Sequence, residues 1–312
     1  MTVVREGTAA SSVNATQTPT VGQAESTQQL TAWQQSFASF RRDRVSMVAL
    51  TVIVVVVLLA ILAPVISPYD PYARTGERLE PLGSPGHIMG TDALGRDLLT
   101  RVLWGGRVSL MAALVPVLLA TLIATLIGII AGYSKAVGNV LMRVVDVFFA
   151  IPNVLLAVAI GAALGPGLMN VMIAIGIYLV PWISRIVYVE VVSIRNSSFV
   201  EAARVCGSSS WQIMVEEILP NAISPIIVAS SIQMGSMITV AAGMSFLGLG
   251  VQPPTSDWGI LVATGRDVLA TAPQVAGIPG LLILIVAASF NLLGDGLRDA
   301  LDPRLHTSKS QV

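Results

Sequence analysis

The side chains that most often carry out enzyme chemistry are few in this chain and lie far apart. They are two histidines, two lysines and one cysteine: His87, His306, Lys135, Lys309 and Cys206. Neither lysine stands in the GxxxxGK[ST] pattern that cradles nucleotide phosphates, and no HExxH pattern occurs. Ser245 follows Gly-Met but has no histidine in its span to act as a base. We therefore expect no hydrolase, no metal site and no ATP-binding loop, so any ATP hydrolysis would take place on another chain.

A hydrophilic stretch, Glu201–Pro220, lies between two strongly apolar segments and carries helix-capping signals. The four residues Ser198–Glu201 have the spacing of a capping box, in which both side chains satisfy free N–H groups at a helix start. Gly207 can adopt a positive φ and end that helix. A second capping box at Ser209–Gln212 predicts another helix that runs to Leu219-Pro220. On capping alone, this is a well-capped loop between membrane spans.

The elements that position this stretch are predicted to be membrane helices. The 312 residues are 54% hydrophobic and only 12% charged, with a mean hydropathy of +0.77. Soluble domains carry about 25% charged residues. The predicted fold class is therefore all-α and polytopic, in contact with membrane lipid. The net charge of zero gives no reason to expect a nucleic-acid partner.

Charge-free runs of about 20 residues predict six transmembrane helices. They are Ser46–Ile66, Ser109–Gly132, Val147–Leu164 with a helical lead-in from Asn139, Met169–Ser184, Asn221–Leu249 and Val275–Leu293. We expect no ionisable group at their mid-membrane depth. That expectation argues against a proton-driven carrier, although it argues less against sodium coupling through backbone carbonyls.

The placement of Lys and Arg predicts the orientation. Twelve of the eighteen fall in segments on the N-terminal side of the membrane, so both termini and the hydrophilic stretch are expected in the cytosol. Residues 1–44 form an N-terminal tail without a signal-peptide core. Within it, Leu30–Phe40 is either an interfacial amphipathic helix or a plain linker. Residues 45–300 form the membrane domain, and residues 301–312 form a cytosolic tail.

The fifth span is the most polar of the six, which predicts a helix facing a polar and variable solute. The candidate pathway-lining residues are Gln233, Ser230, Met234 and Met237. Methionine adapts to different side chains, and an amide is costly against lipid. The alternative is helix–helix packing, which also uses small and hydroxylated residues.

The outer segment before the second span contains Gly90–Asp97, which predicts an interfacial helix capped by Thr91 or Asp92. Charged pairs at i,i+4 are expected on its polar face, Asp92 with Arg96 and Asp97 with Arg101. In the outer loop before the sixth span, Trp258 is expected either to touch a partner or to anchor at the interface.

Several strings resemble a known family. Glu201-Ala202-Ala203, then Gly207 and Leu219-Pro220, resemble the EAA motif of membrane subunits of bacterial binding-protein-dependent ABC importers. Glu217 departs from that motif, because the family favours an aliphatic residue three before the proline. The GTDxxGRD string at 90–97 is similar to the second permease subunit of dipeptide and oligopeptide importers, the OppC/DppC type. Further strings continue this resemblance from about residue 44 to 304.

The resemblance implies an ABC importer type I permease fold in a bacterial inner membrane. It implies a homologous permease as a heterodimer partner, two ATP-binding subunits or domains, and an extracytoplasmic substrate-binding protein. ATP and Mg would be bound by the partners, with no cofactor in this chain. The coupling segment would be residues 196–220, with the contacts Glu201, Ala202, Ala203, Gly207, Leu219 and Pro220. The implied cargo is di- or oligopeptides; nickel or another small solute, or a stand-alone secondary carrier, are the alternatives.

Overall fold

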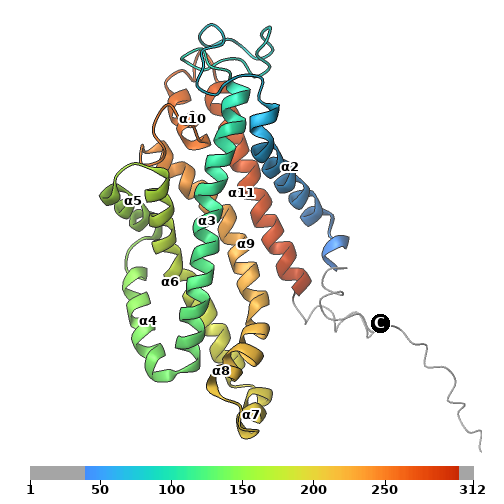
Figure 1. The fold of residues 1–312 in the computed structure, drawn as a ribbon, viewed down its shortest axis with the longest axis vertical. Helices are drawn as coiled ribbons and strands as arrows, with labels where there is room; N and C mark the ends of the chain where they lie inside the picture. Colours follow the sequence, from blue (N-terminus) through green and yellow to red (C-terminus); the bar gives the residue numbers. More distant parts are fainter. Residues whose placement is uncertain (1–38, 302–312) are drawn as a thin grey trace, which may run out of the picture.

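The computed structural model describes residues 39–301, which form a bundle of long helices (Figure 1). Among these residues no strand occurs, so the all-α prediction is confirmed. The elements are α2 (Arg44–Ile66), α3 (Leu98–Tyr133), α4 (Lys135–Phe149), α5 (Asn153–Leu164), α6 (Leu168–Arg195), α7 (Ser198–Val205), α8 (Ser210–Gln212), the π-helical turn η1 (Ile213–Ile218), α9 (Leu219–Phe246), α10 (Trp258–Arg266) and α11 (Gln274–Leu301). Most of the 1–44 tail, and nearly all of the 301–312 tail, lie outside the described residues.

Five of the described helical runs are long and apolar enough to cross a membrane: α2, α3, α6, the run Ser210–Phe246 that ends in α9, and α11. α4 and α5 together are also long and apolar enough for a sixth crossing. That crossing would be a broken span, because the two helix axes are bent by 85°. The predicted third span as one continuous helix is therefore wrong. Pro152 stands at the break, since proline pushes the preceding residue out of the helical region.

Several helices run well past the predicted spans. α3 begins at Leu98 instead of Ser109, and α6 continues to Arg195 instead of ending at Ser184. Charge-free windows end where a charged side chain appears, whereas backbone hydrogen bonding continues into the region beside the membrane. Because of these extra turns, α6 ends only three residues before α7 begins at Ser198.

The most extensive helix–helix contact is between α3 and α6, and glycines allow the two helices to approach each other closely. A Cβ built on Gly128 would lie 2.5 Å from Val187 Cβ, and one on Gly132 would lie 2.6 Å from Val191 Cβ. The two glycines stand four residues apart, as in the small-xxx-small pattern that lets membrane helices pack backbone to backbone. Because α3 and α6 both end beside the 196–220 segment, this contact gives that segment a rigid base.

Figure 1 shows how the elements are distributed along the bundle. The 67–97 loop and α10 lie at one end, and α7 and α8 lie at the other. α2 runs beside α3 and α11, whereas α4 and α5 lie on the opposite side of the bundle. The hydrophilic segment that carries the EAA string is thus separated from the 67–97 loop by the full length of the helices.

The expected helix start at Thr91 or Asp92 is wrong. These residues form turns, with Gly90 and Gly95 at positive φ, and the helix begins only at Leu98. Asp97 caps α3 by accepting a hydrogen bond from the Thr100 backbone N–H at 2.8 Å. Two left-handed glycines in six residues break a helix, because helical φ is negative.

Candidate functional site

The 196–220 segment leaves the bundle at the end of α6. The Arg195 guanidinium donates to the backbone carbonyls of Gly132 and Tyr133 at 2.8 and 3.1 Å, which joins the C-terminal ends of α6 and α3. Tyr133 in turn donates its hydroxyl to Ser210 Oγ at 3.1 Å. Cationic side chains at a helix C-terminus satisfy the last free carbonyls. The segment is therefore fixed to two helices at its base.

The first predicted capping box is wrong by one residue. The N-cap of α7 is Ser197, whose side chain makes no capping bond and instead donates to the Ile194 carbonyl at 2.6 Å. Glu201 then falls at the fourth helical position, one beyond the position that a capping box requires. The tight turn out of α6 uses the Ser197 hydroxyl, so it is not available to α7.

The end of α7 at Gly207 is confirmed. Gly207 has φ +89°, its N–H donates to the Arg204 carbonyl at 3.1 Å, and the Ser208 N–H donates to the Ala203 carbonyl at 3.1 Å. These two bonds form a Schellman motif, which glycine favours because it has no Cβ to strain the left-handed region. Gly207 thus sets the direction in which the chain turns from α7 into α8.

The second predicted capping box, over Ser209–Gln212, is confirmed. The Gln212 N–H donates to Ser209 Oγ at 3.3 Å, and Gln212 Oε1 accepts from the Ser209 N–H at 2.9 Å. The sequence predicted that the following helix ends at Leu219-Pro220. Instead it continues through η1 into α9. Pro220 has no N–H, and its ring crowds the carbonyl four residues earlier, which accounts for the wider π turn before it.

The segment has a buried side and an exposed side. Val200, Ile213 and Ile218 are fully buried against the core of the bundle. On the other side Val205 is 83% exposed and Trp211 is 70% exposed. Exposed large apolar side chains on a polar segment are typical of interaction surfaces, and tryptophan is enriched among the residues that dominate binding.

The predicted coupling residues divide between these two sides. Glu201, Ala202, Gly207 and Pro220 are exposed, whereas Ala203 and Leu219 are half-buried and pack against the core. Glu217, which departs from the family pattern, is half-buried, and its carbonyl accepts from the Asn221 amide at 2.6 Å. The exposed members can meet a partner directly, and the packed members can pass a displacement into the bundle.

The candidate pathway residues lie inside the single chain. Gln233 is 6% exposed, Ser230 and Met237 are also buried, and Met234 is half-buried. The Ser230 hydroxyl lies 2.9 Å from Thr121 Oγ1 on α3 and donates to the Ile226 carbonyl at 2.8 Å. Ser230 therefore joins α9 to α3 in this conformation. A role for these four residues in lining the pathway stays a prediction.

An ion pair between α4 and α6 is a feature that sequence analysis missed. Arg185 Nη2 donates to Asp146 Oδ1 at 2.8 Å, and both side chains are about half exposed, at 42% and 54%. The two residues stand directly outside the predicted third and fourth spans. Asp146 lies 11 residues after the start of α4 at Lys135, and Arg185 lies 10 residues before the end of α6 at Arg195, a rise of about 15 Å along each helix. A charged pair at such a depth is costly against lipid.

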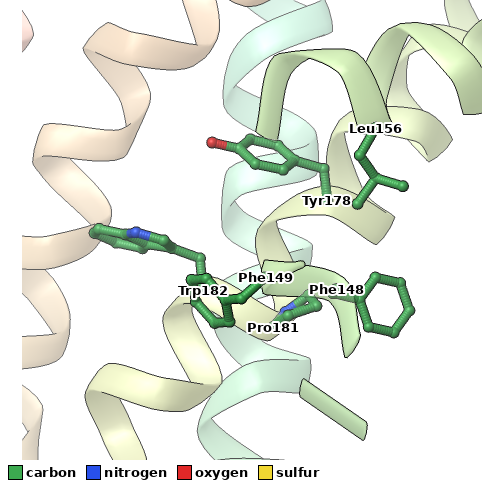
Figure 2. Close-up of a pocket in the computed structure, with 6 residues that line it drawn as sticks. All are labelled: Phe148, Phe149, Leu156, Tyr178, Pro181 and Trp182. Carbon is green, nitrogen blue, oxygen red and sulfur yellow. The ribbon is translucent and has the colours of Figure 1, made fainter. Parts of the chain in front are cut away.

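Aromatic side chains lie on the same face of α6 as Arg185. Tyr178, Trp182 and Arg185 recur at helical spacing on one face of α6, and Arg185 lies over the Phe149 ring at 5.9 Å. Figure 2 shows Tyr178 and Trp182 projecting to the same side of α6 at a small pocket that Phe148, Phe149, Leu156 and Pro181 complete. This face of α4 and α6 therefore combines opposite charges with aromatic rings.

The 67–97 loop holds a buried charged cluster. Asp92 pairs with Arg96 at 2.7 Å, as predicted, and with Arg101 at 3.5 Å. The predicted Asp97–Arg101 pair is wrong, because Asp97 instead lies 2.9 Å from Nδ1 of buried His87. The His87 pKa is raised, mainly by this hydrogen bond. His87 and Asp97 are ten residues apart, so whether they meet depends on the path of the loop. The i,i+4 spacing of charged residues carries no information about that path.

Trp258 is neither an interfacial anchor nor a free contact surface. It is 2% exposed, its Nε1 donates to the Val102 carbonyl at 3.0 Å, and its backbone N–H donates to Ser109 Oγ at 2.9 Å. Both expectations for this residue are wrong, because α10 docks on α3 where Gly105 and Gly106 leave room for the indole and the preceding residue. Across residues 39–301, no group of three metal-ligating side chains comes together.

The fold and the exposed helical segment define a class of protein. A chain of an inward-facing structure of the MetNI methionine ABC transporter is similar over 66% of this chain and 96% of its own length, with a TM-score of 0.54 and 20% identity. At that identity the similarity establishes the fold alone, which is that of an ABC importer permease. The predicted fold class is thereby confirmed.

The family follows from the sequence matches. Residues 124–307 match the binding-protein-dependent transport system inner membrane component family, and residues 31–81 match the N-terminal TM domain of oligopeptide transport permease C. The chain belongs to the binding-protein-dependent transport system inner membrane component family. It is a multi-span inner-membrane permease subunit and not an enzyme, and membership implies ATPase and substrate-binding partners.

Relatives with assigned names place it within that family. A glutathione transport system permease protein GsiD of Pectobacterium atrosepticum is 39% identical over 277 residues, or 88% of this chain and 92% of the relative. A di/tripeptide transport system permease protein DppC of Pseudomonas aeruginosa is 41% identical over 247 residues, or 77% and 82%. The chain is thus a permease subunit of an ABC importer related to peptide and glutathione transport.

Proposed function

We propose that this chain forms half of a translocation pathway for di- and oligopeptides, and that its 196–220 segment couples the pathway to ATP hydrolysis on partner chains. A homologous, non-identical permease would supply the other half. Two ATPase subunits or domains would bind ATP and Mg²⁺. When the ATPase pair closes, the two 196–220 segments would act as levers that switch the pathway between its two open states.

The observation that carries the coupling proposal is the exposed apolar side of the 196–220 segment. Val205 in α7 and Trp211 in α8 are its most exposed large apolar side chains, here called the tip, while Val200 and Ile218 anchor the same segment in the core. An apolar tip on a polar segment is stabilised when a partner covers it. Because the anchor is fully packed, a push on the tip moves α6 and α9 rather than only the loop.

The orientation forms part of this proposal. The arginine-rich residues before α2 and the 196–220 segment would lie in the cytosol, with the 67–97 loop and α10 on the opposite side, facing the substrate-binding protein. Since the ATPases are cytosolic, this orientation brings them to the exposed tip. The chain termini would then both be cytosolic.

The proposed cargo rests on chemistry as well as on relatives. The relatives with assigned names transport glutathione or di/tripeptides, which are short peptides. A half-exposed ion pair beside aromatic rings suits a zwitterionic solute, because Asp146 and Arg185 offer both signs of charge. Within residues 39–301, no metal-ligating cluster favours nickel, and family membership does not favour a stand-alone carrier.

The test is a pull-down of the tagged chain, in mild detergent, from cells that also express its transporter partners. The expected result is co-elution of a P-loop ATPase with wild type and its loss from Gly207→Pro. Proline has φ near −65° and no N–H, whereas Gly207 needs φ +89° and donates to Arg204. Uptake of labelled dipeptide by the same cells should fall with the ATPase signal.

Gly83→Pro is the matched control. Gly83 also has a positive φ of +80° and open space around it, but it lies in the 67–97 loop at the other end of the bundle. This variant should keep the ATPase and the membrane level of wild type. Normal peptide uptake by Gly207→Pro would contradict the lever proposal. Co-elution of the ATPase with wild type, without any peptide uptake by the same cells, would contradict the proposal that the cargo is a peptide.

A further inference from the structure

Two adjoining cavities lie beside the part of α3 nearest the 67–97 loop. The first has a volume of about 270 Å³ and is partly polar, with Tyr72, Trp104, Thr255 and Ser256 in its wall. The second, also about 270 Å³, lies between α2 and α3 and is almost entirely apolar. Arg107 and Met111 belong to both walls. A polar cavity joined to an apolar groove fits an amphiphilic molecule.

The two cavities are ordered along the helix axes. α2 runs toward the 67–97 loop and α3 runs away from it, so Ile61 and Arg107 mark the groove end near the loop, and Val57 and Val115 mark the deep end. Eight residues separate Arg107 from Val115, a rise of about 12 Å. That length covers most of one leaflet of a hydrocarbon core about 30 Å thick.

The length of α3 allows Arg107 to lie at the depth of the lipid headgroups. It is 26 residues from Tyr133 at the other end of α3, which is a rise of about 39 Å. The hydrocarbon core, about 30 Å thick, can therefore end below the guanidinium. The groove wall beneath it is open to the surroundings, since Ile61 and Met111 are exposed large apolar side chains.

The polar end offers unpaired donors. Among the described residues no carboxylate pairs with Arg107, whose guanidinium instead lies 5.3 Å from the Trp104 ring centre. The Nε1 of Trp104 is buried without a hydrogen-bond partner. An unpaired buried donor is costly, and an arginine matches the oxygens of a phosphate. This end of the groove therefore favours an anion.

We propose that the α2–α3 groove binds one anionic phospholipid of the leaflet nearer the 67–97 loop. Its phosphate pairs with Arg107 in the polar cavity, and one acyl chain lies along Ile61, Leu114 and Val115. A phospholipid supplies the negative group and the apolar chain in one molecule. An apolar partner helix would leave the guanidinium without a counter-charge. The proposal is independent of the cargo and of the coupling role.

The test is native mass spectrometry of the purified transporter complex, titrated with phosphatidylglycerol. Wild type should retain one tightly bound lipid. Arg107→Gln should weaken the binding of this lipid about tenfold, because one charge-assisted hydrogen bond to the phosphate is lost. Ile61→Trp should abolish retention by filling the groove. Glycerophosphate, which has the anion but no chain, should not compete.

Two variants serve as controls: Leu62→Trp, next to Ile61 but outside the groove wall, and Arg143→Gln, an exposed arginine on α4. Both should bind phosphatidylglycerol like wild type, and circular dichroism checks that every variant is folded. The proposal is overturned if Arg107→Gln and Ile61→Trp retain the lipid like wild type, or if glycerophosphate competes equally. Cross-linking of Ile61→Cys to the partner permease in the assembled complex would also overturn it.

Discussion

Among single residues, His87 has a hydrogen-bond acceptor beside each of its two ring nitrogens. Nδ1 lies 2.9 Å from Asp97 Oδ1, and Nε2 lies 3.3 Å from the Thr75 carbonyl. A neutral imidazole can donate to only one of them, whereas the protonated ring can donate to both. Glu80 adds a favourable charge and the Tyr69 ring packs at 5.1 Å. The hydrogen bond to Asp97 outweighs burial, and the His87 pKa is raised.

This raised pKa predicts a pH-dependent loop. The stabilisation is fully present below the unfolded histidine pKa of about 6.5 and is lost as the pH rises through the higher folded pKa. We expect thermal unfolding in detergent to show wild type more stable than His87→Gln at acidic pH, with the gap closing above neutral pH. His306→Gln serves as the control. A gap that widens with pH would contradict the assignment.

Trp258 offers a second test at the residue scale. Trp258→Phe removes the hydrogen bond from Nε1 to the Val102 carbonyl and part of a buried ring, and should lower the free energy of unfolding by about 1–2 kcal/mol. Trp211→Phe, at a 70% exposed position, should change it by less than about 0.5 kcal/mol. Chemical denaturation of both purified variants measures the difference. Equal effects would show that α10 is not docked through Trp258.

At the scale of the elements, the α3–α6 contact depends on two glycines. Gly128→Leu would place its Cβ 2.5 Å from Val187 and 3.1 Å from the Ser184 carbonyl, so the helices would have to separate. Overpacking of this kind costs about 1–3 kcal/mol. We expect a lower melting temperature and, because α3 and α6 support the 196–220 segment, weaker binding of the ATPase.

Gly176 provides the matched position on α6. A Cβ there meets nothing within 4 Å, so Gly176→Leu should be neutral or stabilising by up to about 1 kcal/mol. Both variants change helix propensity in the same way, but only Gly128→Leu forces α3 and α6 apart. Comparing them therefore separates the effect of helix separation from the effect of helix propensity. If both leucine variants melted at the same temperature, the close approach of α3 and α6 would not be what holds the bundle.

At the scale of the whole molecule, the proposed orientation can be read from one thiol. Cys206 is the single cysteine of the chain, and it is exposed in the 196–220 segment. A membrane-impermeant maleimide should label it in inside-out vesicles stripped of ATPase, but not in intact cells. Restoring the ATPase should protect it, since Val205 beside it lies on the proposed docking surface.

The opposite end of the bundle supplies the reciprocal measurement. Ile88 is 72% exposed in the 67–97 loop, so Ile88→Cys in a Cys206→Ser chain should react from outside and not from the cytosolic side. Because the two positions lie at opposite ends of the helices, their labelling patterns must be opposite (Figure 1). Labelling of both from one side would refute the orientation.

Features that depend on neighbouring residues could be predicted from the sequence. Long apolar runs predicted the spanning helices, Gly207 predicted the end of α7, and Ser209–Gln212 predicted the start of α8. The EAA string and the GTDxxGRD string indicated the family. Each of these signals acts within a few residues or one helix, where composition, φ preference and capping bonds decide the outcome.

Which distant residues meet became known from the three-dimensional fold. It paired Asp146 with Arg185 across 39 positions, gave Asp97 to His87 instead of Arg101, and buried Trp258 against α3. It also bent α4 against α5 and placed Gln233 inside the chain. Such contacts depend on helix packing and loop path, which bring together side chains whose separation in sequence carries no spacing signal.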